Sequence, residues 1–183
     1  SKTDQSGSQE PYLIVVIEDI TVRKDTELAL AARAEQQAAI MDIGQRALSE
    51  HDLNALLSDA ANVIAQIMSV DFCLISQRDR SSSEFSIVGT NDAGKKYVGW
   101  PVQPRIRHLK TIFEAPALEP VVFHRGDQDS PDITSPIMED IGTISAASVV
   151  IAGDDNTPRG ILIIHNQTHR EFTNDEITFL QTV

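Results

Sequence analysis

The sequence has one cysteine, a shortage of positive charge and no long apolar run. The single thiol, Cys73, excludes an intramolecular disulfide and a metal site built from several cysteines. No apolar run approaches the roughly 20 residues that cross a bilayer, and no signal-peptide pattern is found. We therefore expect a cytoplasmic protein whose residues make no direct membrane contact. The chain ends within a helical pattern, so we interpret it as a fragment.

Charge narrows the choice of partners. Lys and Arg number 15 against 27 Asp and Glu, and the formal net charge is −12. Nucleic acids and anionic membranes attract clusters of basic residues, so we expect no nucleic-acid partner. The 183 residues suffice for one core with an appendage.

A long helix is the strongest local feature. Residues Thr21 to Leu48 contain no Pro and no Gly before Gly44, and good helix formers dominate. Apolar and small residues follow two lines at helical spacing, so one face can pack on this chain's own sheet and the other on a partner. We expect a homodimer through this helix; the simpler alternative is the first helix of one globular domain. The first line is Leu30, Ala34, Gln37, Met41, Gly44 and Leu48, and the second is Ile40, Ile43 and Ala47.

The residues before this helix have the pattern of a strand and a turn. A polar stretch up to Glu10 precedes a β-branched run from Tyr12 to Ile20, and Asp19-Ile20-Thr21 then forms a turn suited to capping a helix. Val15 to Lys24, followed by Glu27 and Leu30, resemble the end of a PAS domain. This resemblance implies a truncated PAS domain at 1–20 and a signalling helix at 21–48. We expect the strand at Tyr12–Glu18 to pair with a partner chain or with the downstream domain.

Residues 49–183 alternate between helical and strand patterns. Asp52 is a suitable N-cap for a helix over Leu53–Met68, and Thr173 to Glu176 is a capping box that opens a last helix. Between these helices the patterns predict strands, short helices and an irregular segment. The strands are 71–79, 84–90, 120–124, 146–152 and 160–166; the short helices are 106–113 and 137–141; the irregular segment is 90–117.

This order of elements resembles a GAF domain. The resemblance is carried by Leu53 to Ile75, Leu118 to Val122, Gly160 to His165 and Phe172 to Leu180, and the first helix of the domain overlaps 37–48. It implies an α+β fold, with helices on one face of an antiparallel sheet and a small-molecule pocket on the other face. The roof of that pocket would be loops and short helices between Thr90 and Ile141. Five candidates for the pocket are Trp100, His108, Phe113, His124 and Met138.

No cofactor can be assigned from the sequence. Haem is one alternative, with His108, His124 or His165 as its ligand. Cyclic-nucleotide binding is another, although Gln167 and Ile177 depart from the pattern of GAF domains that bind these nucleotides. We expect no covalent bilin attachment, because bilin-binding relatives use a cysteine in the roof segment and the only cysteine here, Cys73, lies in the first strand of the domain.

No catalytic or metal constellation is evident either. Gly89 to Lys96 nearly matches a phosphate-binding loop, but Lys96 replaces the Ser or Thr that binds magnesium. His165 and His169 lie four residues apart at a strand end, without an acidic third ligand at suitable spacing. We therefore expect a regulatory sensor, not an enzyme, that transmits through its terminal helices to a missing effector such as a histidine kinase. The alternative is a ligand-free dimerisation spacer whose own side chains fill the pocket.

Overall fold

The computed structural model describes residues 20–49, 52–79, 81, 84–102, 119–127, 135–153 and 157–183. The expected strand at Tyr12–Glu18 and the expected helix at 106–113 lie outside these residues. The chain divides into two units, Ser1–Arg33 and Ala34–Val183, and the second contains the whole sheet. Among the described residues, no helix combines the length and the apolar character that crossing a membrane requires.

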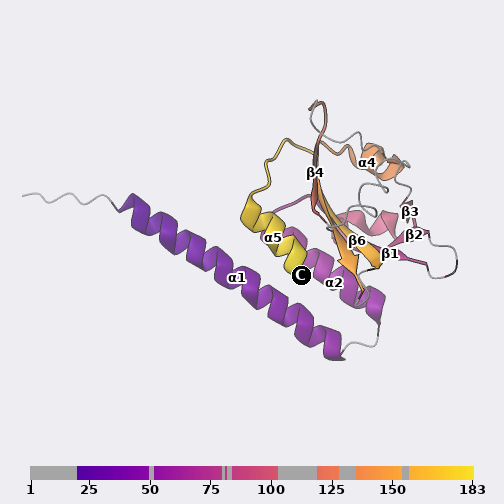
Figure 1. The fold of residues 1–183 in the computed structure, drawn as a ribbon, viewed down its shortest axis with the longest axis horizontal. Coiled ribbons are helices and arrows are strands. Elements are labelled where there is room, and N and C mark those ends of the chain that lie inside the picture. Colours follow the sequence, from indigo (N-terminus) through magenta and orange to yellow (C-terminus); the bar gives the residue numbers. More distant parts are fainter. Residues whose placement is uncertain are drawn as a thin grey trace, which may run out of the picture. The chain divides into compact units, whose positions relative to one another are not determined.

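Helix α1 spans Thr21–Ser49 and confirms the expected long helix (Figure 1). In the second unit, Ile40 and Ile43 of this helix pack against the main core. Two members of the other predicted line, Leu30 and Met41, are exposed by 62% and 74%. The helix therefore has a face that covers this chain's core and a face with exposed apolar residues.

Helix α2 spans Leu53–Met68, as the periodicity predicts. The Asp52 carboxylate accepts hydrogen bonds from the backbone N–H groups of Asn54 and Ala55, so two of the unpaired amides of the first turn are satisfied. At the other end Ser69 adopts a left-handed conformation, with φ of 50°, and its N–H closes the last turn.

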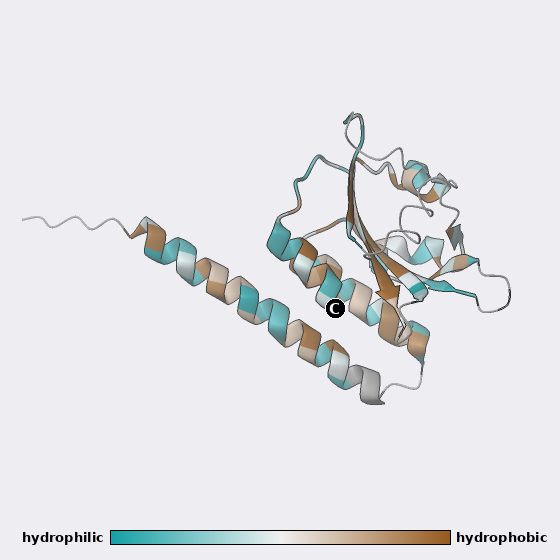
Figure 2. Cartoon of the chain, viewed as in Figure 1, coloured by the Kyte–Doolittle hydropathy of each residue, from teal (hydrophilic) through white to brown (hydrophobic). Residues whose placement is uncertain are grey.

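Six antiparallel strands form one sheet, in the order β3-β2-β1-β6-β5-β4. Strands β1 and β6 pair at the centre, from Phe72↔His165 to Gln77↔Gly160. Figure 2 shows hydrophobic colouring along these central strands, as expected where both faces of a sheet are covered. The bounds are β1 Phe72–Arg78, β2 Phe85–Thr90, β3 Pro101–Val102, β4 Val121–His124, β5 Ser145–Ala152 and β6 Pro158–Asn166.

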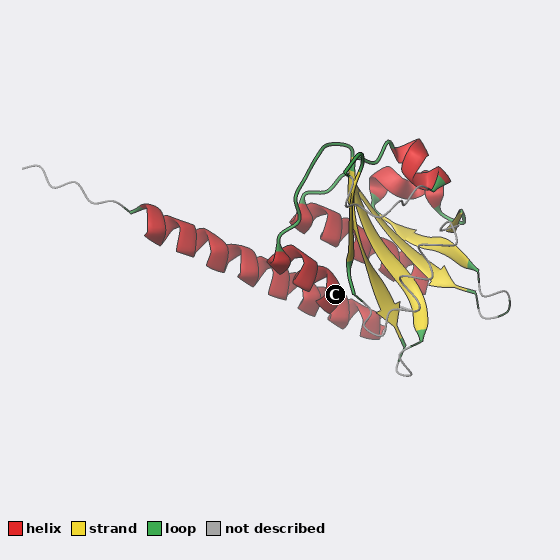
Figure 3. Ribbon diagram, turned by 45° about the horizontal axis from the view of Figure 1, so that its top comes forward, coloured by secondary structure: helices red, strands yellow, loops and turns green. Residues whose placement is uncertain are grey.

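Helices cover one face of the sheet and short helices lie on the other (Figure 3). The main core joins α2, the sheet and α5, which spans Asn174–Thr182. The opposite face carries two smaller clusters that include residues of α4, Pro136–Ile141. Alternation along β1 explains this division, because Cys73 and Ile75 point to the helices while Leu74 points to the other face.

Asp92–Tyr97 forms a 3₁₀ helix, η1, where we expected irregular chain. Asn91 fixes the start of this helix, since its side chain accepts from Cys73 N–H and donates to the Asp71 carbonyl. At the other end Tyr97 is 1% exposed and packs in the cluster that contains Leu74 of β1 and Ile137 of α4. These tertiary contacts outweigh the weak local signal of a stretch that contains Gly94 and Gly99.

Candidate functional site

An apolar cavity lies on the sheet face opposite α2 and α5. Its volume is about 70 Å³, and the hollow measures about 650 Å³ when all the space between its walls is counted, open solvent included. Ligand pockets usually measure about 300–1,000 Å³, so the cavity as it stands holds only a few water molecules and a larger ligand has to extend into the open space. The lining residues are Leu74, Ile87, Val102, Phe123, Ser135, Ile137, Met138, Ala146, Ala147, Ser148, Ile161, Ile163 and His165.

Strands β5 and β6 form the floor of the cavity. Ile161, Ile163 and His165 alternate along β6 with Leu162 and Ile164, which belong to the main core. Ser148 of β5 pairs with Ile163, and its side chain brings one of the few polar groups in the lining. The same strands therefore contact the cavity on one face and the helices on the other.

Helix α4 contributes Ile137 and Met138 to the other side of the cavity. Its first turn is held by Ser135, whose hydroxyl accepts from the Met138 N–H at 3.2 Å. Asp140 binds this helix to η1, because its Oδ2 accepts from Lys96 Nζ at 2.6 Å and from the Tyr97 hydroxyl at 2.8 Å. The hydrogen bond from Lys96 is the main reason that the pKa of Asp140 lies below its ordinary value.

His165 is the buried polar side chain of the cavity. It is 2% exposed, and its Nδ1 atom lies 3.2 Å from the hydroxyl of Thr143. Its Nε2 atom is buried without a hydrogen-bond partner among the described residues. Burial lowers the pKa of His165 from 6.5 to about 4, so the imidazole is neutral at pH 7. A ligand that offers a polar atom to Nε2 removes the cost of this unpaired group.

Gln167 connects α4 to the segment that follows β6. Its side-chain amide donates to the carbonyl of Ile141, the last residue of α4, at 2.7 Å. Its backbone N–H donates to Asp71 Oδ2 at 2.8 Å. This hydrogen bond therefore ties the end of α4 to the chain between β6 and α5.

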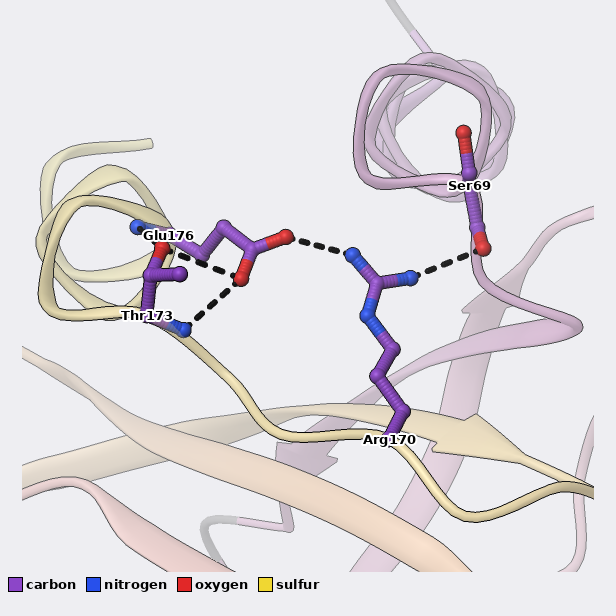
Figure 4. A network of polar contacts seen from close by, with 4 residues as sticks. All are labelled: Ser69, Arg170, Thr173 and Glu176. Atoms are coloured by element: carbon purple, nitrogen blue, oxygen red, sulfur yellow. Dashed lines mark hydrogen bonds and ion pairs between the residues drawn. The ribbon is translucent and has the colours of Figure 1, made fainter.

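Arg170 connects the same segment to two helices (Figure 4). Its guanidinium donates to the carbonyl of Ser69, at the end of α2, at 2.9 Å and forms an ion pair with Glu176 of α5. Glu176 also accepts from the N–H of Thr173 at 2.8 Å, which completes the predicted capping box. Burial acts to raise the pKa of Glu176, but the Thr173 N–H and the Arg170 guanidinium outweigh it and hold this pKa below its usual value.

A second hollow lies on the helix face of the sheet, and its volume is about 520 Å³. Ile43 of α1, Leu57 of α2 and Leu180 of α5 line it together with residues of β5 and β6. Its lining includes no buried polar group without a partner among the described residues. The cavity that contains His165 is therefore the better candidate for a selective ligand site.

The five candidates from the sequence are dispersed in the structure. Met138 lines the cavity and is 6% exposed. Trp100 is 38% exposed and packs edge-on against Tyr97, and His124 contacts Ser145 and His169; neither lines the cavity. His108 and Phe113 lie outside the described residues. The alternation of β6 is the signal that could have added Ile161 and Ile163. The sequence suggests His165 only as a haem ligand or as one half of a metal-binding pair with His169.

Two sequence features have structural explanations. Both lysines of Gly89 to Lys96 pair with carboxylates, Lys95 with Asp92 at 2.9 Å and Lys96 with Asp140. Cys73 is fully buried, and burial raises the pKa of its thiol. A buried protonated thiol is a poor nucleophile.

Comparisons with known proteins agree with this architecture. The family model described as GAF domain matches residues 52–183, well over half of the chain. A comparison with curated proteins finds no match. Among solved structures, the GAF domain of a phosphoenolpyruvate-protein phosphotransferase from Acinetobacter is 20% identical, with a TM-score of 0.62 and 80% and 86% of the two chains covered.

Two further solved structures have similar folds. The phycoerythrobilin-bound GAF domain from a cyanobacterial phytochrome is 12% identical, has a TM-score of 0.63 and covers 80% of this chain and 88% of its own. A GAF domain described as part of a sensor histidine kinase from Pseudomonas syringae pv. tomato is 14% identical, has a TM-score of 0.56 and covers 85% and 86% of the two chains. At these identities the likeness shows the fold.

Proposed function

The chain belongs to the GAF domain family, and on this basis we propose that it is a sensory module that binds a small, largely apolar molecule between β5, β6 and α4. Similar GAF domains occur in phytochromes, in phosphotransferases and in a protein described as a sensor histidine kinase. The observation that carries the proposal is the apolar cavity with the unpaired Nε2 atom of His165. Such a cavity favours a ligand with an apolar body and one polar atom for His165.

The proposed signal leaves through β6 and α5. Strand β6 supplies part of the cavity floor and leads through Gln167 and Arg170 to α5. Phe179 and Leu180 hold α5 on the main core, and burial of each such side chain contributes about 1.5–3 kcal/mol. A ligand that binds more tightly when α4 is in one position shifts α5 toward the matching position. The size of this shift is set by the difference between the ligand's affinities for the two positions of α4.

Filling the cavity is expected to abolish binding without unfolding the chain. In Ser148→Phe the new ring occupies the cavity floor, so fluorescence enhancement of the anionic dye 1-anilinonaphthalene-8-sulfonate, whose aromatic rings bind apolar sites, should fall several-fold, while the unfolding midpoint stays equal or rises. Ser148→Ala keeps the space and serves as the matched control. Equal probe binding by wild type and Ser148→Phe contradicts the proposed site. An absence of probe binding in wild type supports the ligand-free spacer.

We also propose that α1 forms a homodimer through its exposed apolar face, and that it relays a signal from a PAS domain of which residues 15–24 resemble the end. In Met41→Glu a carboxylate replaces a side chain that is 74% exposed in the single chain. Burial of this carboxylate in the dimer interface without a partner should raise the dissociation constant of the dimer at least tenfold. Analytical ultracentrifugation measures this constant. Met41→Leu should dimerise like wild type. A monomeric wild type, or a dimeric Met41→Glu, contradicts this interface.

A further inference from the structure

Three metal-ligating side chains gather where β4 ends. His124 is the last residue of β4, while His169 and Glu171 belong to the segment between β6 and α5. One ligand atom from each residue lies within 4.8 Å of the other two. The Glu171 carboxylate reaches both imidazoles, with its Oε2 at 3.6 Å from His124 Nε2 and its Oε1 at 3.5 Å from His169 Nε2.

These separations are long for hydrogen bonds and close to those of metal ligands. Protein N–H···O bonds have a usual length of about 2.9 Å. Zinc bonds of about 2.0–2.2 Å in a tetrahedron place neighbouring ligand atoms about 3.4 Å apart. The imidazoles of His124 and His169 are stacked, with centroids 5.1 Å apart and planes at 23°. The side chain of His169 is 65% exposed, so its ring can turn until both Nε2 lone pairs converge.

A neighbouring hydroxyl supports this role for His124. Its Nδ1 atom lies 3.2 Å from Ser145 Oγ, and the two residues are paired across β4 and β5. Ser145 Oγ also accepts from the Arg170 N–H at 3.0 Å. A hydroxyl oxygen can accept a second hydrogen bond, from Nδ1–H, and the tautomer of His124 that makes this bond carries its lone pair on Nε2. Zinc-ligating histidines commonly have a partner of this kind on the other ring nitrogen.

We propose that His124, His169 and Glu171 bind a divalent transition-metal ion, with Zn²⁺ the best match to two imidazole nitrogens and one carboxylate oxygen. A water molecule completes the tetrahedron. The ion joins β4 to the segment that carries Arg170, and therefore stabilises the connection to α5. Sequence spacing did not reveal this cluster, because its members come from segments that are far apart in the chain.

The test is Zn²⁺ titration of the full chain by isothermal titration calorimetry after treatment with a chelator. Wild type should bind one Zn²⁺ per chain, and His169→Ala and Glu171→Gln should each weaken binding at least tenfold. Both side chains are well exposed, so these variants should fold, which thermal unfolding without metal verifies. Glu27→Gln, which removes an exposed carboxylate of α1 outside the cluster, is the charge-matched control and should bind like wild type.

Two results would overturn the site. The first is that wild type does not bind Zn²⁺ at millimolar concentration. The cluster would then be a contact between two imidazoles and a carboxylate, with no role in metal binding. The second is equal affinity of wild type, His169→Ala and Glu171→Gln.

Discussion

Replacing Gly160 by alanine is expected to destabilise the chain by at least about 3 kcal/mol. A Cβ atom at this position would lie 2.3 Å from the carbonyl oxygen of Ser76 and 3.4 Å from Ile151 Cδ1. The oxygen belongs to the backbone of the neighbouring central strand, so no side-chain rotation relieves the overlap. The β1–β6 pairing at the centre of the sheet has to separate locally instead.

Gly44→Ala is the matched control for this substitution. Gly44 is an exposed position of α1, and a Cβ atom there meets no atom within 4 Å. Alanine in a helix interior should therefore stabilise by about 0.5–1 kcal/mol. Urea unfolding measures both variants. Equal stability of Gly160→Ala and wild type would contradict the close approach of β1 and β6.

Acid is expected to destabilise the folded chain through His165. In the unfolded chain this imidazole has a pKa near 6.5, whereas burial lowers the pKa to about 4 in the folded chain. Between these values the unfolded state binds the proton more readily, so the stabilisation is complete above pH 6.5 and is lost as the pH falls toward 4. The difference between the two pKa values corresponds to about 3 kcal/mol.

Urea unfolding at pH 7 and pH 4.5 measures this effect. His165→Gln lacks the titrating group and should lose about 2–3 kcal/mol less than wild type over that interval. Glu176 contributes in a lower range: its pKa is lowered from 4.5, so its stabilisation is present above pH 4.5 and is lost below it. Glu176→Gln therefore separates the two groups. An imidazole of His165 that titrates near 6.5 in the NMR spectrum of the folded protein would contradict the buried, neutral state.

Periodicity and capping were sufficient to predict most of the fold. The α2 helix, its Asp52 cap, strands β5 and β6 and the Thr173 capping box all confirm expectations from local spacing. The helix and the strands were predictable because their apolar residues also face the core, and the caps because Asp52 and Thr173 act on amides of the adjacent turn. The predicted division of α1 into two faces was correct for Ile40 and Ile43, which pack on the core.

The candidate site was harder to predict because it depends on contacts between distant segments. The Asn91 side chain bridges η1 to β1, and Asp140 joins α4 to Lys96 of η1. No short-range pattern reports either contact. His165 looked like a strand-end histidine, and only the assembled sheet shows that its Nε2 atom is buried beside an apolar cavity. Met138 was identified because an apolar residue on a short helix above the sheet has few other places to pack.

The most direct test of the sensor account is a crystal structure of the chain with a small molecule selected by its ability to raise the unfolding temperature of wild type but not of Ser148→Phe. The account predicts that the molecule lies between β6 and α4, with a polar atom within hydrogen-bond distance of His165 Nε2. A molecule bound elsewhere, or a cavity closed by the chain's own side chains, would contradict it.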